Sequence, residues 1–414
     1  MKIRKTKNLG RSIKHIRELK QAPEISVLIA SDWAPIRALE SPMRSNPESV
    51  YGDMLPLLRS ADLRIVNCEC ALTSFRKPVW KSGTVFKGEP EHLRGLAAVP
   101  FEVACLANNH VFDYGLPGFK ESLQLLHGGG IRTVGAGLTG EQAYEPLTLT
   151  VQETKVHIIN FSEGEDLTSS RGEPGVAGWD IPGILAWIRR CKKKGSLVIA
   201  IGHCGLEYIP YPPPYVAAAF RSMADAGADC VIGHHPHVPQ GIEWRKGKPI
   251  AYSLGNFVFY QHTDLYYRKT GYCVTLRFAG DAVSGFEIHP YRITGSGLQK
   301  LEAREETRFR RTIARISRPL RSVAGIEKAW QAYLAYYGTA GFEGEVKNIL
   351  ERMRAEPPKG AAMFRNRITT MQHSELWRDF LTRMMARTPP GYSREAYKTV
   401  TEWFSAKAEI QRSG

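Results

Sequence analysis

The sequence predicts an α/β fold followed by a helical C-terminal region, and three observations lead to this prediction. Short apolar runs typical of buried strands alternate with segments of helical periodicity over residues 24–299. Acid, amide and histidine side chains stand at the ends of five of these runs. From residue 300 the strand-like runs stop and apolar residues recur at helical spacing. We therefore divide the chain into a basic N-terminal extension (1–23), an α/β domain (24–299) and a basic helical region (300–414).

Side chains that can bind a metal stand at the carboxyl end of each predicted strand. Helical segments at 118–126 and 215–224 lie between the strands, and this alternation predicts that the strand ends meet at one edge of a sheet, where open α/β folds place their ligands. The runs and the groups that follow them are 25–30 with Asp32, 63–66 with Asn67 and Glu69, 101–106 with Asn109 and His110, 196–201 with His203, and the run leading into His234, His235 and His237.

The three histidines within residues 234–237 are the most specific part of this pattern. Crowded imidazoles lose solvation when buried and repel one another when protonated, so a bound cation is the first interpretation. His235 and His237 flank Pro236 at spacing i and i+2, which predicts the same side of an extended segment. The alternatives are a loop in which histidines coincide and, at the other strand ends, side chains that merely cap a turn. Recurrence at five strand ends favours a shared metal site.

The motifs resemble, in their order, the CapA family of capsule-synthesis or poly-γ-glutamate biosynthesis proteins, which is built on the calcineurin-like metallophosphoesterase fold. The similarity covers roughly residues 24–293. It implies four layers, two packed mixed sheets covered by helices, with a dinuclear metal site at the strand ends. The residues that carry it are Asp32, Asn67 and Glu69, 107–110 with Asp113, His203 with Glu207, 233–237 and 252–257.

This resemblance implies two divalent transition-metal ions and assigns roles to the motif residues. Mixed oxygen and imidazole donors independently suit Mn, Fe or Zn. Either Glu69 or Asp32 would bridge the ions, and His110, with Asp113 three residues later, would provide acid–base catalysis or stabilise an oxyanion. The implied metal ligands are Asp32, Glu69, Asn109, His203, His235 and His237.

Four further residues are predicted to bind substrate: Asn67, Glu207, His234 and Asn256. For Glu207 a solvated loop charge is the alternative, and for Asn256 the alternative is orientation of a metal ligand. The remaining histidines, His262 and His373 among them, have no ligand-type neighbour at useful spacing and are predicted to be structural. The region after residue 300 has no ligand cluster, so we expect the chemistry not to need it.

Two positions depart from ordinary phosphoesterases of this fold. Ala34 stands where they carry a histidine, and Val111 stands where they carry a carboxylate after the catalytic histidine. Both changes are consistent with the CapA branch, and they weaken the transfer of a detailed phosphatase mechanism.

The charge is concentrated at the two ends of the chain. Residues 1–20 carry a net charge of +7 and residues 301–414 a net charge of +8, whereas residues 21–300 are neutral with 27 charges of each sign. We expect an anionic small-molecule or polymer substrate, no nucleic-acid partner, and any peripheral contact with a membrane or protein through the basic termini. The alternative is a pair of solvated helical faces.

Seven cysteines without paired spacing argue against a disulfide framework and for a reducing compartment. Because no apolar segment follows the basic N-terminus, we expect a cytoplasmic protein. Three functions stay open: a metal-dependent hydrolase of a phosphoester or related acyl or amide bond; an accessory protein of polyglutamate-type polymer synthesis whose metal site binds carboxylates with slow or no turnover; and a binding module with a vestigial site. An acid–base histidine beside a complete ligand set favours the hydrolase over the binding module.

Overall fold

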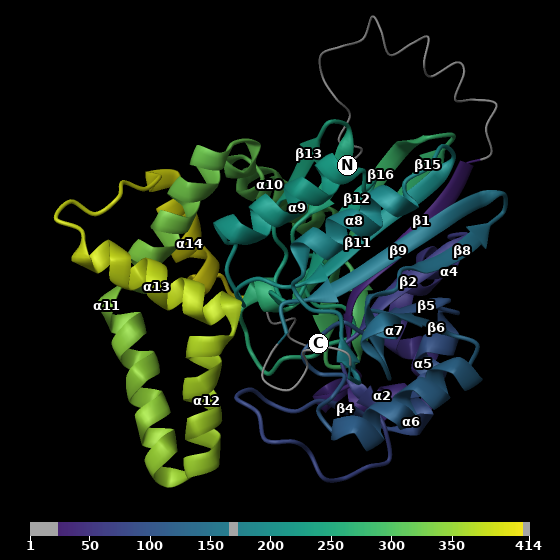
Figure 1. The fold of residues 1–414 in the computed structure, drawn as a ribbon, viewed down its shortest axis with the longest axis horizontal. Helices are drawn as coiled ribbons and strands as arrows, with labels where there is room; N and C mark the ends of the chain where they lie inside the picture. Colours follow the sequence, from purple (N-terminus) through teal and green to yellow (C-terminus); the bar gives the residue numbers. More distant parts are fainter. Residues whose placement is uncertain (1–23, 165–172, 409–414) are drawn as a thin grey trace, which may run out of the picture.

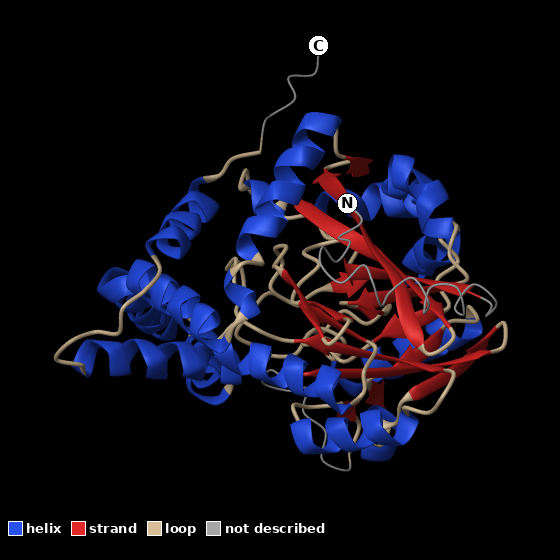
Figure 2. Cartoon of the chain, turned by 90° about the horizontal axis from the view of Figure 1, so that it is seen from above, coloured by secondary structure: helices blue, strands red, loops and turns tan. Residues whose placement is uncertain are grey.

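Two packed β-sheets with helices on their outer faces form the centre of the molecule. The computed structural model describes residues 24–164 and 173–408, so the predicted extension 1–23 lies outside the described residues. Helices flank the strands on both sides in two perpendicular views (Figures 1 and 2). The four layers expected from the family resemblance are therefore confirmed.

The first sheet has seven strands in the order β17-β16-β15-β1-β2-β5-β6. Strands β1, β2, β5 and β6 run parallel, whereas β15, β16 and β17 continue the sheet antiparallel from β1. The strand bounds are β1 (Glu24–Trp33), β2 (Leu63–Cys68), β5 (Val103–Cys105), β6 (Arg132–Val134), β15 (Thr270–Ala279), β16 (Ala282–Thr294) and β17 (Gly297–Lys300).

The second sheet has six strands in the order β13-β14-β12-β11-β9-β8, of which β9, β11, β12 and β14 are parallel. Two short ribbons, β3-β4 and β7-β10, lie outside the two large sheets. The bounds are β8 (Leu147–Val151), β9 (Thr154–Ser162), β11 (Ser196–His203), β12 (Cys230–His234), β13 (Ile242–Arg245), β14 (Lys248–Ala251), β3 (Ala71–Leu72), β4 (Lys87–Gly88), β7 (Ala136–Gly137) and β10 (Gly175–Val176).

Helices cover each sheet because alternate strand residues are apolar on both faces. Val27 and Ile29 of β1 point into the core between the sheets, while Leu28 and Ala30 pack against the outer helices of the first sheet. These helices are α2 (Glu40–Ser45), α3 (Pro47–Tyr51), α4 (Leu55–Arg59), α5 (Leu93–Ala98) and α6 (Gly115–Gly128), while α8 (Ile181–Cys191) and α9 (Pro214–Ala226) cover the second sheet and α7 (Gly140–Tyr144) packs beside β7 and β10.

The C-terminal residues form helices that lie beside the sheets (Figure 1). Gly338, with φ of 55°, breaks the longest of them. In the described residues no helix is long and apolar enough to cross a membrane. The helices are α10 (Ala303–Ile316), α11 (Val323–Ala355), α12 (Pro357–Thr369), α13 (Met371–Met385) and α14 (Arg394–Ser405); the 3₁₀ helices of the chain are η1 (Arg37–Leu39), η2 (Gly52–Met54), η3 (Pro90–His92), η4 (Tyr266–Arg268) and η5 (Pro319–Arg321).

The helical region is not a separately packed unit. Buried side chains such as Phe309, Trp330, Leu376 and Trp403 belong to the same hydrophobic core that fills the space between the sheets. All seven cysteines are buried and unbridged. The change of composition after residue 300 therefore marks a change of secondary structure within one continuous core.

Candidate metal centre

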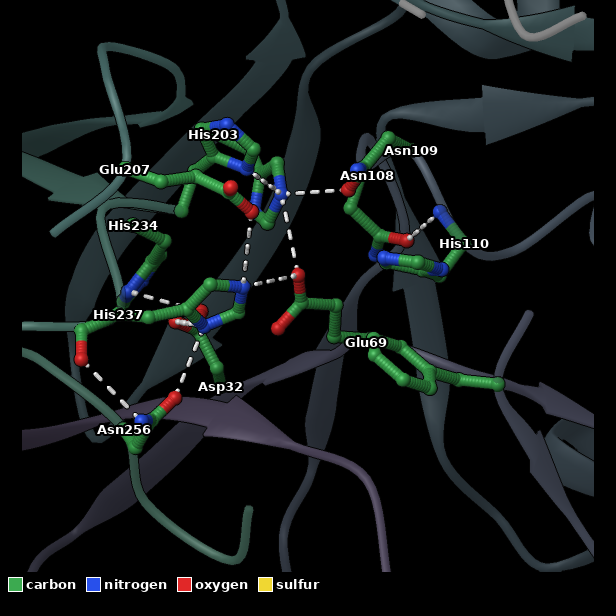
Figure 3. Close-up of polar contacts among 12 residues, drawn as sticks. Asp32, Glu69, Asn108, Asn109, His110, His203, Glu207, His234, His237 and Asn256 are labelled. Carbon is green, nitrogen blue, oxygen red and sulfur yellow. Dashed lines mark hydrogen bonds and ion pairs between the residues drawn. The ribbon is translucent and has the colours of Figure 1, made fainter. Parts of the chain in front are cut away.

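The predicted site residues come together where the parallel strands of both sheets end (Figure 3). Asp32 lies near the end of β1, Glu69 directly follows β2, and Asn109 lies in the loop after β5. His203 ends β11, and His235 and His237 follow β12. The parallel direction of these strands places their carboxyl ends at one edge, which is why groups distant in sequence converge.

The converging side chains form two groups that share one carboxylate. Glu69, His203 and His235 offer ligand atoms within 4.8 Å of one another, and so do Asp32, Glu69 and His237. Oε1 of Glu69 lies 3.4 Å from Nε2 of His203 and 3.7 Å from Nε2 of His237. Oδ1 of Asn109 lies 2.9 Å from Nε2 of His203, which adds an amide oxygen to the first group. Of the two carboxylates expected as a bridge, Glu69 has the central position.

Buried oxygen atoms in both groups lack partners among the described residues. Asp32 and Glu69 are fully buried, and Oδ2 of Asp32 and both oxygens of Glu69 accept no hydrogen bond. Leaving a buried carboxylate unpaired is costly, and a coordinated cation removes that cost. The donor set of carboxylates, an amide oxygen and imidazoles is of the kind that holds divalent transition metals. These residues therefore fit a metal centre.

Burial shifts the pKa of two carboxyl groups and two imidazoles of the candidate centre toward the neutral form. Desolvation raises the pKa of Asp32 to about 7, although a hydrogen bond from Asn67 opposes the shift. Desolvation and the nearby charge of Asp32 raise the pKa of Glu69 well above its usual value. Desolvation and neighbouring imidazoles lower the pKa of His203 and of His237. Without a cation, burial thus favours protonated carboxyl groups at Asp32 and Glu69 and neutral imidazoles at His203 and His237.

Three of the four residues predicted to bind substrate lie behind the candidate ligands. Nδ2 of Asn67 donates to Oδ1 of Asp32 at 2.8 Å, and Nδ1 of His237 donates to Oδ1 of Asn256 at 2.8 Å. Nδ1 of His234 lies 3.1 Å from Oγ of Ser31. None of the three lines the cavity described below, and Asn67 and Asn256 make contacts that orient candidate ligands, the alternative already considered for Asn256.

The backbone around Pro236 differs from the extended segment predicted. Strand β12 ends at His234, and the next two histidines have φ of 96° for His235 and 56° for His237. Positive φ is costly for a residue with a side chain and persists where the surroundings enforce it. Both imidazoles reach the centre from this strained turn. They do not lie on one side of an extended strand, as their i, i+2 spacing predicted.

A buried ionic network orients His110. Nδ1 of His110 lies 2.7 Å from Oδ2 of Asp113, and Nζ of Lys81 lies 2.9 Å from Oδ1 of the same carboxylate. Burial raises the pKa of Asp113, but the charges of His110 and Lys81 outweigh it and hold the pKa below its usual value. The ring of Phe86 packs against His110 with 4.1 Å between centroids and the ring planes tilted by 37°. With Nδ1 bound by Asp113, proton transfer by this imidazole would proceed through Nε2.

A cavity of about 400 Å³ opens beside these groups. Asn109, His110 and His237 line one part of it, and Glu207 is the predicted substrate-binding residue that also lines it. Three arginines and two histidines that sequence reasoning did not select also line it: Arg37, Arg268, Arg367, His262 and His373.

The C-terminal helices contact the candidate ligands directly. Nε2 of His235 lies 2.7 Å from Oε1 of Gln372 on α13, a geometry in which the imidazole donates to the amide oxygen. His373 is 8% exposed and lines the cavity. The region after residue 300 therefore lies against the candidate centre, and the expectations that the chemistry does not need it and that His373 is structural stay predictions. This contact arises because tertiary packing brings the C-terminal helices to the strand ends, and no local sequence pattern predicts that packing.

Lys81 and Gln372 were also missed by the sequence interpretation. Lys81 stands in a polar loop after Trp80, and Gln372 stands at the start of an amphipathic helix. A single buried lysine or glutamine has no periodic or spaced pattern. No feature of the sequence could have selected either residue.

Comparisons with known proteins match the first two thirds of the chain. Residues 9–261 match the family model described as bacterial capsule synthesis protein PGA_cap. The PGA biosynthesis protein CapA of Bacillus subtilis (strain 168) is 31% identical over 218 residues, which cover 52% of this chain and 57% of that protein. The capsule biosynthesis protein CapA of Bacillus anthracis is 30% identical over 227 residues, 53% of this chain and 55% of that protein. The chain thus spans little more than half the length of these two relatives.

A longer alignment is found with a probable polyglutamine synthesis accessory protein of Mycobacterium tuberculosis (strain CDC 1551 / Oshkosh). It is 29% identical over 294 residues, 65% of this chain and 76% of that protein. Among solved structures, a hypothetical protein from Thermus thermophilus aligns with a TM-score of 0.41 and 14% identity over 65% of this chain and 99% of that chain. That structural likeness is too distant to bear on function.

Proposed function

Since this chain belongs to the bacterial capsule synthesis protein PGA_cap family, we propose that it is a metal-dependent hydrolase in the metabolism of a polyglutamate-type or capsule polymer. The observation that carries the proposal is Glu69, which is fully buried between two groups of donor atoms and has no hydrogen bond to either carboxylate oxygen within the described residues. We assign Asp32, Glu69 and His237 to one divalent transition-metal ion, and Glu69, Asn109, His203 and His235 to a second.

Such ions, when bound, supply Lewis acidity that activates water and polarises a phosphoryl or carbonyl oxygen. The chain's own residues then have separate tasks. His110 delivers a proton to the leaving group through Nε2, and Asp113 fixes the imidazole by holding Nδ1. Arg37 and Arg268 line the cavity and attract an anionic substrate. The bond cleaved is a phosphoester or an acyl or amide bond such as a γ-glutamyl linkage.

Metal analysis of protein purified without chelator tests this proposal. We expect one to two Mn, Fe or Zn ions per chain, lost for the most part in His235→Ala and His237→Ala. His127→Ala is the matched control, because His127 is exposed on α6 and contacts Thr133 rather than the centre. Stoichiometric metal in both site variants, or no metal in the parent under metal-replete conditions, would contradict the proposed metal centre.

A second candidate is an accessory protein that binds carboxylates of the polymer without turning them over. Two observations favour it: Ala34 replaces a histidine of ordinary phosphoesterases of this fold, and the M. tuberculosis relative is named as an accessory protein. A screen of phosphoesters and γ-glutamyl amides with added Mn separates the two. Hydrolysis that His110→Ala abolishes supports the hydrolase, whereas metal and polymer binding without any turnover supports the accessory role.

A further inference from the structure

The junction of α12 and α13 forms one wall of the cavity beside the candidate metal centre. Met363, Asn366 and Arg367 of α12 and His373 of α13 line it, together with the strand-end residues of the α/β domain. This junction lies beyond residues 9–261, the part of the chain that matches the family model. Whatever the wall recognises is therefore a property of this chain's own C-terminal region.

Two buried polar side chains in this wall have unused hydrogen-bonding atoms. Asn366 is 1% exposed and His373 is 8% exposed. Within the described residues, Nδ2 of Asn366 and Nδ1 of His373 have no hydrogen-bond partner. Buried polar atoms normally find partners, and these two residues line a cavity large enough for a ligand. A ligand oxygen could satisfy the Asn366 amide directly.

Arg367 stands next to these atoms in a fixed orientation. Its Nε donates to Oε2 of Glu345 at 3.0 Å, and its Nη1 donates to Oδ1 of Asn366 at 3.0 Å. These bonds orient the guanidinium of Arg367 and the side-chain amide of Asn366. Nη2 of Arg367 forms no hydrogen bond in the described part of the chain. A guanidinium held in this way is suited to bind a carboxylate or phosphate oxygen.

The other walls of the cavity add positive charge. Arg268 lies over the ring of Tyr208 at 3.4 Å, and Arg37 donates to the backbone oxygen of Tyr260 at 2.8 Å. Neither arginine forms an ion pair within residues 24–164 and 173–408. Arg367 is paired with Glu345, so Arg37 and Arg268 against Glu207, the single carboxylate of the lining, leave it positively charged, which favours an anion.

The wall is attached to the α/β domain at two points. Nζ of Lys359 on α12 donates to the backbone oxygens of Lys81 at 3.0 Å and Gly83 at 2.7 Å. On α13, Gln372 contacts His235 at 2.7 Å. The wall is thus held in position against both the loop that carries Lys81 and a candidate metal ligand, as recognition of a substrate requires.

We propose that Arg367 and Asn366 bind an anionic group of the substrate, a carboxylate or a phosphate, at a distance from the bond that reacts, and that this contact sets substrate specificity. This inference rests on the proposed function, because the proposed metal centre defines where the reacting bond lies. A molecule that reaches both the strand ends and the α12–α13 wall must carry this anionic group apart from its reacting group, as a γ-glutamyl peptide or a phosphorylated ester does.

Binding to the full-length, Mn-loaded protein tests the proposal without requiring turnover. Titration calorimetry would use γ-glutamylglutamate as the carboxylate probe and N-acetylphosphoethanolamine, whose phosphate is separate from its amide bond, as the phosphate probe. We expect Arg367→Gln to weaken one of them roughly 10- to 100-fold, the range for loss of a charge-assisted hydrogen bond, and Arg367→Lys to weaken it less. The probe that weakens identifies the anion.

Arg378→Gln is the matched control, since Arg378 lies on α13, pairs with Glu375 and does not line the cavity. Metal content and thermal unfolding of each variant show that the centre and the fold are intact. Unchanged binding of both probes by Arg367→Gln, or no binding of either probe by the parent, overturns the proposal. Arg367-dependent binding by a parent that hydrolyses nothing supports this inference and contradicts the hydrolase instead.

Discussion

The protonation of the Glu69 carboxyl group depends on whether a cation occupies the candidate site. It is fully buried, both of its oxygens lack partners, and desolvation together with Asp32 raises its pKa well above the usual value. In the metal-free protein burial thus favours the protonated form of Glu69, whereas a coordinated cation requires the carboxylate. Protons and metal ions consequently compete for the same atoms.

This competition predicts that stabilisation by metal grows with pH. In the metal-free fold the pKa of Asp32 is about 7, above its value of 3.8 when exposed, so its contribution to stability is lost as pH rises through about 7. Bound metal replaces that proton. The increase in Tm caused by Mn should therefore be larger at about pH 7.5 than at about pH 5.5, as differential scanning fluorimetry would measure.

His203 and His237 do not reverse this trend. Burial lowers the pKa of both, so each is neutral in the metal-free and in the metal-bound fold. Protonation of these imidazoles in the unfolded chain below about pH 6.5 lowers the stability of both forms alike. A Tm increase that is constant across this pH range would contradict the assignment of Asp32 as a ligand.

His110→Ala should separate proton transfer from metal binding. The imidazole is oriented by Asp113 at 2.7 Å and belongs to neither group of metal donors. We expect turnover to fall roughly 10²–10⁴-fold, about 3–6 kcal/mol in activation free energy, with metal content nearly intact. His203→Ala should lose metal and activity together. Equal turnover by His110→Ala and the parent would refute the catalytic role.

At the scale of elements, the start of α13 supports a candidate ligand from outside the α/β domain. The bond from His235 Nε2 to Gln372 Oε1 leaves Nδ1 of the imidazole directed toward His203, 3.1 Å from its Nε2. Hydrogen bonds to the second nitrogen of a metal-binding histidine fix the ring orientation and its tautomer. The helix therefore contributes to the geometry of the centre without supplying a ligand.

Gln372→Ala should weaken metal binding without unfolding the protein. Loss of such a supporting hydrogen bond typically lowers metal affinity roughly 10- to 100-fold. Competition with a chelator of known affinity would measure the change. Gln299→Ala on the exposed end of β17 is the control and should behave as the parent. Parent-like affinity in Gln372→Ala would show that packing of the turn alone holds His235.

At the scale of the whole molecule, the helical region completes the core between the sheets. The ring of Trp403 on α14 stacks on Tyr267 at 3.5 Å, and its Nε1 donates to the backbone oxygen of Tyr208 at 3.1 Å. Tyr208 lines the cavity. A chain cut near residue 300 would expose this apolar surface, so we expect it to aggregate or to lose metal affinity, contrary to the expectation from sequence.

Trp403→Ala tests this coupling in the intact chain. Trp403 is 3% exposed, and removal of a buried tryptophan typically lowers the free energy of unfolding by about 3–5 kcal/mol. Denaturant unfolding followed by circular dichroism would measure the loss. Phe404→Ala, whose ring stacks on the exposed Tyr336, should cost clearly less. Similar small losses in both variants would mean that α14 packs independently of the core.

Much of the fold and of the candidate centre follows from local patterns. The predicted strands 25–30, 63–66 and 196–201 lie within β1, β2 and β11, while the predicted strand 101–106 is shorter, as β5. The groups at their ends converge because parallel strands present their carboxyl ends at one edge. The positions of the strands and of the groups at their ends can be predicted because the alternation of apolar residues and the motifs each extend over only a few neighbouring residues.

The sequence by itself determined the strand–helix alternation, the four layers implied by the family motifs, and the set of acid, amide and imidazole groups that meet. Tertiary structure alone decided that Glu69 lies between the two groups of candidate ligands, that Asn67 and Asn256 hydrogen-bond candidate ligands, and that Lys81, Arg367 and Gln372 reach the candidate site. The physical reason is distance along the chain. A periodic pattern reports the face on which a residue lies, whereas a contact between α13 and β12 depends on how the packed core folds the helices back over the strand ends.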